Sequence, residues 1–387
     1  MKPVTPLVVL VLGGAAERRG CPAAESPLGR AVRPNLDRLA AKGRVFSVRL
    51  CESDAEAATA APVLRILGID PRGVATARAS YVACGRAPPL GDGECYVSAD
   101  FVTVFRDLLA DGEPGPFRPA ETQLLLQAAR EPLARAGFRI HAGDDSHHIA
   151  VAPRAFVDPG VPPPERIAGK PLAAFEPQLE PHALAHKLSK EALDGHEVNE
   201  VRRDLGENGA DMLWLWGPGG AAQLPDLPGA LRARASAVGQ DAVFKGVCRA
   251  AGVPVRETPP RDPTPVADEV ARALETDAIC FVYSRRGIRD ALARDLGLRA
   301  QGLAALDEML VGPVARRAEA KGARLLVLAD VARDTRTGAP LSDAVPALLV
   351  GPGVPAISPR PFTEEAAEAA GDPLEPGHGL LAYVRSL

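Results

Sequence analysis

The sequence is poor in aromatic residues and has no large excess of charge of either sign. Aromatic side chains make up 4% of the 387 residues, and 45 Lys and Arg nearly balance 49 Asp and Glu. So few aromatic rings argue against a surface that stacks bases or sugars. The formal net charge of −4 provides no basic field that would hold nucleic acid or an anionic membrane.

Long apolar runs and paired cysteines are also missing. No run approaches the roughly 18 apolar residues that cross a bilayer. The run Leu7–Leu12 is short for a signal peptide and ends at Gly13-Gly14, so it is interpreted as a buried first strand. None of the six cysteines has Cys-x-x-Cys spacing, which excludes a zinc ribbon of that kind. Scattered cysteines in a long chain predict reduced thiols and a cytoplasmic protein.

Several common catalytic motifs are absent. The sequence has no G-x-G-x-x-G after a strand, no Walker A loop, no G-x-S-x-G and no H-E-x-x-H. His182 and His186 do stand four residues apart, which is the spacing of two metal ligands on a helix. They have no acidic partner in frame and follow a proline-rich stretch, so a solvated helix face is the preferred interpretation.

What is present is an alternation of short apolar runs with helical patterns. This alternation predicts an α/β fold with a mostly parallel sheet flanked by helices. The apolar runs are Leu7–Leu12, 279–283, 325–329 and 347–350, and helical patterns occupy 34–43 and 291–310.

The middle of the chain differs from the rest. Residues 153–182 are rich in proline and predict a surface connection, while 138–140 and 149–152 resemble short strands. We therefore expect a smaller α+β domain inserted at 98–188, with a core domain formed by 1–97 and 189–387.

Short segments spread from residue 26 to residue 346 form an ordered set. They are Ser26-Pro27-Leu28, Pro34-Asn35-Leu36-Asp37-Arg38-Leu39, Leu67-Gly68-Ile69-Asp70-Pro71, Thr76-Ala77-Arg78, His196-Glu197-Val198-Asn199 with Arg202, Leu213-Trp214-Leu215-Trp216-Gly217-Pro218-Gly219, Val311-Gly312-Pro313 and Asp343-Ala344-Val345-Pro346. Each segment alone is a weak signal, but the order is specific. The set resembles the archaeal-type cofactor-independent phosphoglycerate mutases of the alkaline phosphatase superfamily.

The resemblance implies a fold and a chemistry. It implies an alkaline-phosphatase-like core that holds two divalent ions, manganese or zinc, at the ends of the sheet strands. A serine between the ions takes the phosphoryl group of 3-phosphoglycerate and returns it to the 2-hydroxyl, a glycolytic isomerisation. The ions would lower the pKa of the nucleophile and neutralise the transferring group.

The chain departs from the family at most of the metal-ligand positions. Of six such positions besides the nucleophile, the resemblance keeps only Asp330. The other five carry side chains without a donor atom for a metal: Gly13, Ile288, Leu292, Val331 and Pro340. Since losing even a supporting partner of a ligand costs about 10–100-fold in affinity or activity, we expect no metal cofactor. Asp330 then becomes a helix cap or a hydrogen-bonded acid.

The position of the nucleophile is changed as well, whereas the substrate-holding positions are better kept. The nucleophile position falls at Thr59, followed by Ala60 where the family has aspartate. The resemblance assigns substrate-binding roles to Arg78, His148, Asn199 and Arg202.

Each substrate-holding residue also has a structural alternative. Arg78 and Arg202 can form ion pairs with acids such as Asp70 or Glu200. Asn199 can cap a helix, and the histidine can be a hydrogen-bonded residue of the inserted domain.

Three hypotheses follow. The first is a degenerate, metal-free mutase-like protein that binds a small phosphorylated or carboxylated acid and acts alone, as a homo-oligomer or with an intact paralogue. The second is an active mutase with a Thr59 phospho-intermediate and substitute metal ligands, for which the nearby acids are Glu17, Asp54, Asp290 and Asp295. The third is metal-independent chemistry with Thr59 as nucleophile and His148 as base.

Overall fold

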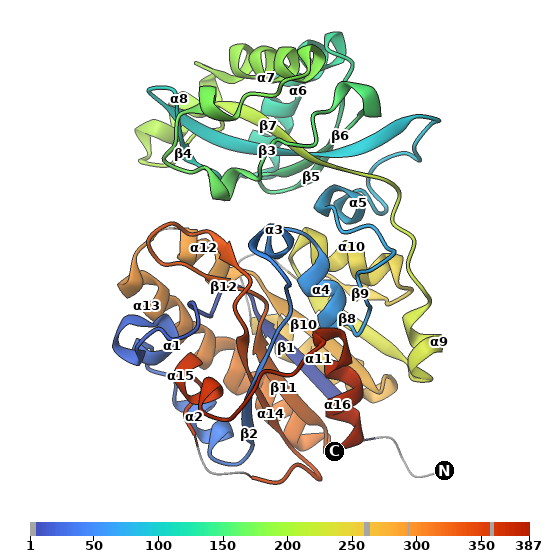
Figure 1. Ribbon diagram of the computed structural model, residues 1–387, viewed down its shortest axis with the longest axis vertical. Helices are drawn as coiled ribbons and strands as arrows, with labels where there is room; N and C mark the ends of the chain where they lie inside the picture. Colours follow the sequence, from blue (N-terminus) through green and yellow to red (C-terminus); the bar gives the residue numbers. More distant parts are fainter. Residues whose placement is uncertain (1–4, 259–263, 293, 357–359) are drawn as a thin grey trace. The chain divides into compact units, whose positions relative to one another are not determined.

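The chain forms two compact units. The computed structural model describes residues 5–258, 264–292, 294–356 and 360–387. Unit 1 comprises Met1–Val74 and Leu224–Leu387, and unit 2 comprises Ala75–Gln223 (Figure 1). No helix in these described ranges is long and apolar enough to cross a membrane.

Unit 1 is built on a seven-stranded sheet in which β1 occupies the middle. β1 is parallel to both neighbours, β10 and β11, and β10 is parallel to β8, whereas β14 is antiparallel to β11. In sheet order the strands are β2 (Arg44–Val48), β14 (Val345–Val350), β11 (Arg324–Ala329), β1 (Leu7–Leu12), β10 (Ile279–Ser284), β8 (Ala235–Gly239) and β9 (Val255–Arg256). All six β1 residues are buried, as expected of a strand covered on both faces. The predicted mostly parallel α/β fold is confirmed.

Helices flank this sheet. α11 packs on β8 and β10, α14 packs on β11, and α2 and α15 pack on β14. The helices of unit 1 are α1 (Pro27–Arg30), α2 (Pro34–Ala40), α3 (Asp54–Ala57), α4 (Ala61–Ile66), α9 (Leu227–Leu231), α10 (Ala242–Ala250), α11 (Thr264–Thr276), α12 (Arg286–Leu292), α13 (Leu296–Leu306), α14 (Gly312–Ala320), α15 (Glu364–Glu368) and α16 (Leu380–Ser386). A two-stranded ladder of β12 (Ala332–Arg333) and β13 (Pro340–Leu341) completes the unit.

The central strands of unit 1 end level with one another. Leu12 at the end of β1 is in register with Ser284 of β10 and with Ala329 of β11. The residues that follow these three strands therefore lie at the same edge of the sheet. We call residues 13–18, 285–288 and 330–336 together the carboxyl edge.

Unit 2 is an antiparallel sheet with α-helices packed on it. The long strand β3 (Glu94–Phe105) pairs with β6, β7 and β4, and β5 pairs with β6. The other elements are α5 (Arg78–Val82), β4 (Leu108–Asp111), α6 (Pro119–Arg135), β5 (Arg139–Asp144), β6 (His147–Pro153), α7 (Glu180–Leu193), α8 (Glu197–Asp204) and β7 (Met212–Gly219). α6 and α7 pack against each other, α6 on β5 and α7 on β7.

The boundaries of unit 2 differ from the predicted insertion at 98–188. That segment lies wholly inside the unit, but its first residue falls within β3 and its last within α7. β7 pairs with β3, and α5 packs on both strands, so segments on either side of the predicted insertion belong to the same compact unit.

His182 and His186 are buried, which corrects the prediction of a solvated helix face. α7 packs on β7, and the exposed fractions of His182 and His186 are 0% and 4%. The His182 Nδ1 accepts a bond from the Asp158 amide at 3.1 Å, and its Nε2 lies 3.0 Å from the Leu215 carbonyl. The His186 Nε2 accepts a bond from the Leu215 amide at 2.9 Å. Both rings therefore bind the backbone of the core, and the described contacts give them no role as a pair of metal ligands.

We predict that acid destabilises unit 2 through its buried histidines. Burial lowers the pKa of His182 and His186, and lowers that of His148 to about 3. Because the unfolded histidines titrate near pH 6.5, the unfolded chain binds more protons below that pH, and the free energy of unfolding then falls. The limiting slope is about 1.4 kcal/mol per pH unit for each histidine.

Thermal melting followed by circular dichroism at about pH 7.5, 6.5 and 5 measures this effect. A double variant that combines His182→Gln with His186→Gln should have a lower melting temperature than the wild-type chain at the highest pH. Its melting temperature should fall less than that of the wild-type chain when the pH is lowered. Equal melting of the wild-type chain at all three pH values would contradict the prediction.

Candidate functional site

The carboxylate of Asp330 is fully engaged by hydrogen bonds at the carboxyl edge. Its Oδ1 accepts bonds from the backbone amides of Gly14 at 2.8 Å and Val331 at 2.6 Å. Its Oδ2 accepts a bond from the Tyr283 hydroxyl at 2.5 Å. Burial, and next the nearby Asp330 charge, hold the pKa of Tyr283 well above its usual range, so the phenol stays a donor. Asp330 is thus a hydrogen-bonded acid.

The space beside Gly13 is already filled. A Cβ at this glycine would lie 2.9 Å from the Ser284 carbonyl oxygen, 3.0 Å from the Tyr283 hydroxyl and 3.2 Å from the Ile288 Cδ1. Contacts this short require neighbouring atoms to move. The volume that a side chain at position 13 would need is therefore occupied by groups from β10 and α12.

The other four replaced positions add apolar atoms. Ile288 and Val331 are buried with exposed fractions of 6% and 3%, and Pro340 is buried in β13. Leu292 is half-buried at the end of α12, beside Gly338. Within the described ranges, no three His, Cys, Asp or Glu side chains form a group that could hold a metal ion. The residues present do not fit the two manganese or zinc ions that the resemblance implies.

The acids considered as substitute ligands have other partners. Asp54 accepts bonds from the amide and hydroxyl of Ser342 at 2.7 and 2.8 Å. Asp295 caps α13 by accepting a bond from the Leu298 amide at 2.9 Å. Asp290 lies 4.0 Å from Arg286, and burial raises its pKa. Asp54 and Asp295 are thus each held in a separate local interaction, whereas the buried Oδ2 of Asp290 accepts no hydrogen bond from the described residues.

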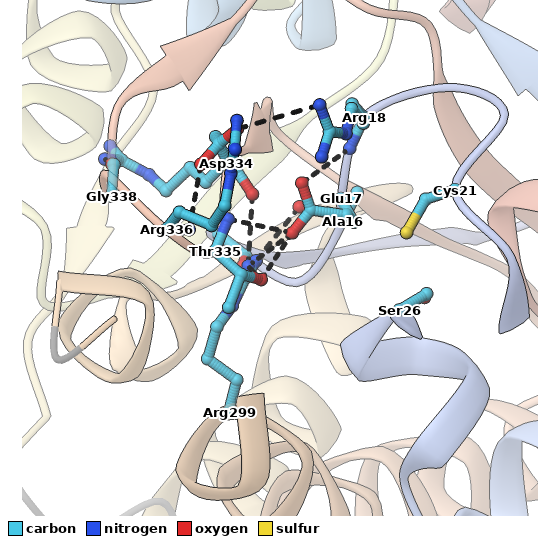
Figure 2. Close-up of polar contacts among 12 residues, drawn as sticks. Ala16, Glu17, Arg18, Cys21, Ser26, Arg299, Asp334, Thr335, Arg336 and Gly338 are labelled. Atoms are coloured by element: carbon cyan, nitrogen blue, oxygen red, sulfur yellow. Dashed lines mark hydrogen bonds and ion pairs between the residues drawn. The ribbon is translucent and has the colours of Figure 1, made fainter. Parts of the chain in front are cut away.

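Glu17, the fourth such acid, belongs to a buried ionic network that the sequence analysis missed (Figure 2). Its Oε2 accepts a bond from Arg299 at 2.9 Å and from the Thr335 amide at 3.0 Å. The Glu17 amide donates to Glu364 at 2.8 Å, and Glu364 also accepts from Ser26. Arg299 further donates to the carbonyls of Gly14, Ala16 and Arg333 at 3.1 Å each. The network joins the loops after β1 and β11 to α13 and α15.

Thr59 uses its hydroxyl to cap its own turn. The Oγ1 donates to the Glu56 carbonyl at 2.7 Å and accepts from the Ala61 amide at 3.1 Å, just before α4. The side chain is half-buried. Thr59 lies in unit 1, whereas His148, its proposed base, lies in unit 2.

Asn199 is completely buried within α8 and does not cap that helix. Its Nδ2 donates to the carbonyls of Leu193 and Ala210 at 2.9 and 2.8 Å, and its Oδ1 accepts from the Ala210 amide at 2.8 Å. The residue that caps α8 is His196, whose side chain accepts from the Val198 amide. Asn199 therefore binds the chain that enters β7.

Arg202 is also buried, with an exposed fraction of 1%. It donates to the Asn208 and Pro116 carbonyls at 2.8 and 3.1 Å and lies over the Phe117 ring. Its ion pairs are with Glu121 and Glu207, at 3.1 and 3.0 Å, and not with Glu200 as expected. Asp70, the other expected partner, pairs with Arg72.

His148 and Arg78 differ sharply in accessibility. His148 is 1% exposed, its Nδ1 accepts from the Gly143 amide at 3.2 Å, and its lowered pKa keeps it neutral. The Arg78 side chain keeps 17% exposure; it pairs with Glu165 at 3.0 Å and lies over the Trp216 ring. Of the four substrate-holding candidates, Arg78 is the one with a charged group that partly reaches solvent.

Next to Arg78 is a polar group that carries no motif in the sequence. Asp100 on β3 is fully buried; its Oδ1 lies 2.9 Å from the His147 Nδ1, and its Oδ2 accepts from the Trp216 indole at 2.6 Å. Asp100 and His147 are paired across β3 and β6. Their cross-strand pairing depends on register, which a single sequence does not reveal.

We predict that Gly13→Asp destabilises the protein without creating a metal site. The new side chain must displace Ser284, Tyr283 or Ile288, which costs about 1–3 kcal/mol. Urea unfolding gives the free-energy change, and elemental analysis after incubation with manganese gives the metal content. Gly379→Asp is the matched control, because an added Cβ there meets no atom within 4 Å. Stoichiometric manganese in Gly13→Asp with unchanged stability would contradict the prediction.

Comparisons with known proteins agree with the resemblance seen in the sequence. The family model of 2,3-bisphosphoglycerate-independent phosphoglycerate mutase matches residues 40–199. The mutase of that name from Methanothrix thermoacetophila is 28% identical over 370 residues, covering 93% of this chain and 94% of the relative. Mutase 2 from Methanothermobacter thermautotrophicus is 26% identical over 351 residues, covering 88% and 87%.

Solved structures share the fold over the whole chain. The PH0037 protein from Pyrococcus horikoshii has a TM-score of 0.70 at 20% identity and covers 99% of this chain and 97% of its own. The cofactor-independent phosphoglycerate mutase from Thermoplasma acidophilum has a TM-score of 0.55 at 18% identity and covers 99% of each chain. In sequence and in fold, the chain is similar to the 2,3-bisphosphoglycerate-independent phosphoglycerate mutases.

Proposed function

We propose that the chain is a degenerate phosphoglycerate mutase-like protein that does not carry out metal-dependent phosphoryl transfer. The observation that carries the proposal is the state of the carboxyl edge. Asp330 accepts bonds from Gly14, Val331 and Tyr283, and the space beside Gly13 is filled by β10 and α12. A divalent ion would have to displace these donors to reach the carboxylate.

The chemistry supports the same conclusion. In two-metal phosphoryl transfer the ions activate the nucleophile and neutralise the charge on the transferring group. Without them, a threonine hydroxyl at neutral pH is a weak nucleophile that needs an adjacent base. The Thr59 hydroxyl donates instead to the Glu56 carbonyl.

A binding role for a small phosphorylated or carboxylated acid is part of this proposal. In unit 2 the support comes from Arg78, whose guanidinium is half-buried and held by Glu165 and Trp216. Arg202 and Asn199 donate their hydrogen bonds to backbone carbonyls of the protein, so in this proposal they stabilise the fold and do not bind the ligand.

The competing proposal is an active mutase that works through a Thr59 phospho-intermediate. Its support is that the relatives from Methanothrix thermoacetophila and Methanothermobacter thermautotrophicus, matched over 94% and 87% of their own length, are named phosphoglycerate mutases. It requires that the bonds at Asp330 rearrange and that acids such as Asp54 and Asp295 leave their present partners.

We predict that the purified protein retains no stoichiometric manganese or zinc and does not convert 3-phosphoglycerate. The protein is incubated with either ion in excess and desalted, and metal is counted by elemental analysis. Turnover is followed by coupling 2-phosphoglycerate formation to enolase. The Methanothrix thermoacetophila relative, treated identically, is the positive control.

About two ions per chain, with turnover that Thr59→Ala abolishes, would overturn the proposal and establish the competing one. Turnover that Thr59→Ala leaves unchanged would overturn both.

A further inference from the structure

Two exposed arginines lie together at the carboxyl edge, just outside the buried ionic network. Arg18 follows Glu17 in the loop after β1, and Arg336 follows Thr335 in the loop after β12. Their side chains are 49% and 76% exposed. Figure 2 shows both side chains beside Asp334.

These two arginines share one carboxylate oxygen at long range. The Asp334 Oδ2 lies 4.0 Å from the Arg18 Nη1 and 3.5 Å from the Arg336 Nη2. The Oδ1 is used elsewhere, because it accepts the backbone amides of Arg336 and Thr337 at 2.8 and 3.0 Å. Each guanidinium carries five N–H donors, so one distant oxygen leaves most of them available to a ligand.

Some exposed arginines of unit 1 are paired more tightly. Arg19 lies 2.8 Å from Glu368, and Arg317 lies 2.7 Å from Asp268. The separations at Asp334 are longer than these two and similar to the 4.0 Å between Arg286 and Asp290.

Hydrogen bonds from the buried ionic network hold the backbone that carries the two arginines. The Glu17 Oε2 accepts the Thr335 amide at 3.0 Å, so the residues that precede Arg18 and Arg336 are bonded directly to each other. Arg299 donates to Glu17 and to the carbonyls of Ala16 and Arg333. A site on anchored backbone loses little entropy when a ligand binds.

The neighbouring helix α12 contributes one exposed arginine with a distant acid. α12 packs beside Gly14 and Gly338, and its Arg286 lies 4.0 Å from Asp290. Arg285, just before the helix, is paired with Asp241 at 3.1 Å.

We propose that Arg18 and Arg336 form a metal-free binding site for the phosphate group of a small phosphate monoester. Paired guanidiniums suit phosphate because each can donate two parallel hydrogen bonds to its oxygens. The ligand phosphate would replace Asp334 Oδ2 as the shared acceptor. The inference rests on the proposed function, because it requires that the carboxyl edge binds its ligand without divalent ions.

The test is calorimetric titration of the full chain with inorganic phosphate and with 3-phosphoglycerate, in buffer containing a chelator. Arg18→Ala and Arg336→Ala should each weaken binding by about 10- to 100-fold, the usual loss for a charged hydrogen bond. Arg19→Ala and Arg317→Ala are matched controls and should leave the affinity unchanged. Asp334→Asn should strengthen binding, because it removes the competing charge but keeps an acceptor for the loop amides.

The possible outcomes separate this inference from the proposed function. Absence of binding with chelator present, in a protein that also retains no metal, overturns the site and leaves the proposed function intact. Binding that requires added manganese and is insensitive to Arg18→Ala overturns both. A third outcome is metal-free binding that is lost in Arg78→Ala but kept in Arg18→Ala and Arg336→Ala. This result would place the ligand in unit 2 and overturn the proposed site. An affinity unchanged in Asp334→Asn overturns the role given to that carboxylate.

Discussion

The carboxyl edge of unit 1 depends on the hydrogen bonds that Asp330 accepts. Gly14 follows β1 and Tyr283 lies in β10, and β11, β1 and β10 are neighbours in that order, so one carboxylate joins the ends of the three central strands. A buried charge of this kind is tolerated only when its lone pairs are satisfied by donors. The structure supplies amides and a phenol in this role.

The replacements at the edge form a mutually dependent set. The Tyr283 hydroxyl reaches Asp330 through the space beside Gly13, and Ile288 closes the same space from α12. A side chain at position 13 is therefore incompatible with the present positions of both residues.

The fold was accessible from sequence because its signals are local. The apolar runs found at Leu7–Leu12 and 325–329 became β1 and β11, and the short strands expected around 138–140 and 149–152 became β5 and β6. The extent of unit 2 was not accessible, because it depends on the pairing of β7 with β3 more than a hundred residues earlier. The resemblance also located Asp330 and Gly13, but the contact between Gly13 and Tyr283 arises from strand register.

Roles of single polar residues were harder to predict than strands. His182 and His186 show helical spacing that looks the same whether the helix faces solvent or β7. Asn199 and Arg202 match a binding motif, yet their bonds go to Ala210, Asn208 and Glu121. The Glu17–Arg299 pair spans 282 residues and left no pattern in the sequence.

The central position of β1 has a consequence for how the chain is made. β1 is synthesised well before its partners, because β10 and β11 begin at Ile279 and Arg324. At about 5–20 residues per second, this apolar strand waits on the order of tens of seconds before it can pair. Unit 2 is a continuous segment and can fold during that delay. Until β10 and β11 are made, Leu7–Leu12 is an unpaired, uncharged strand, a kind of segment that is prone to aggregation during synthesis.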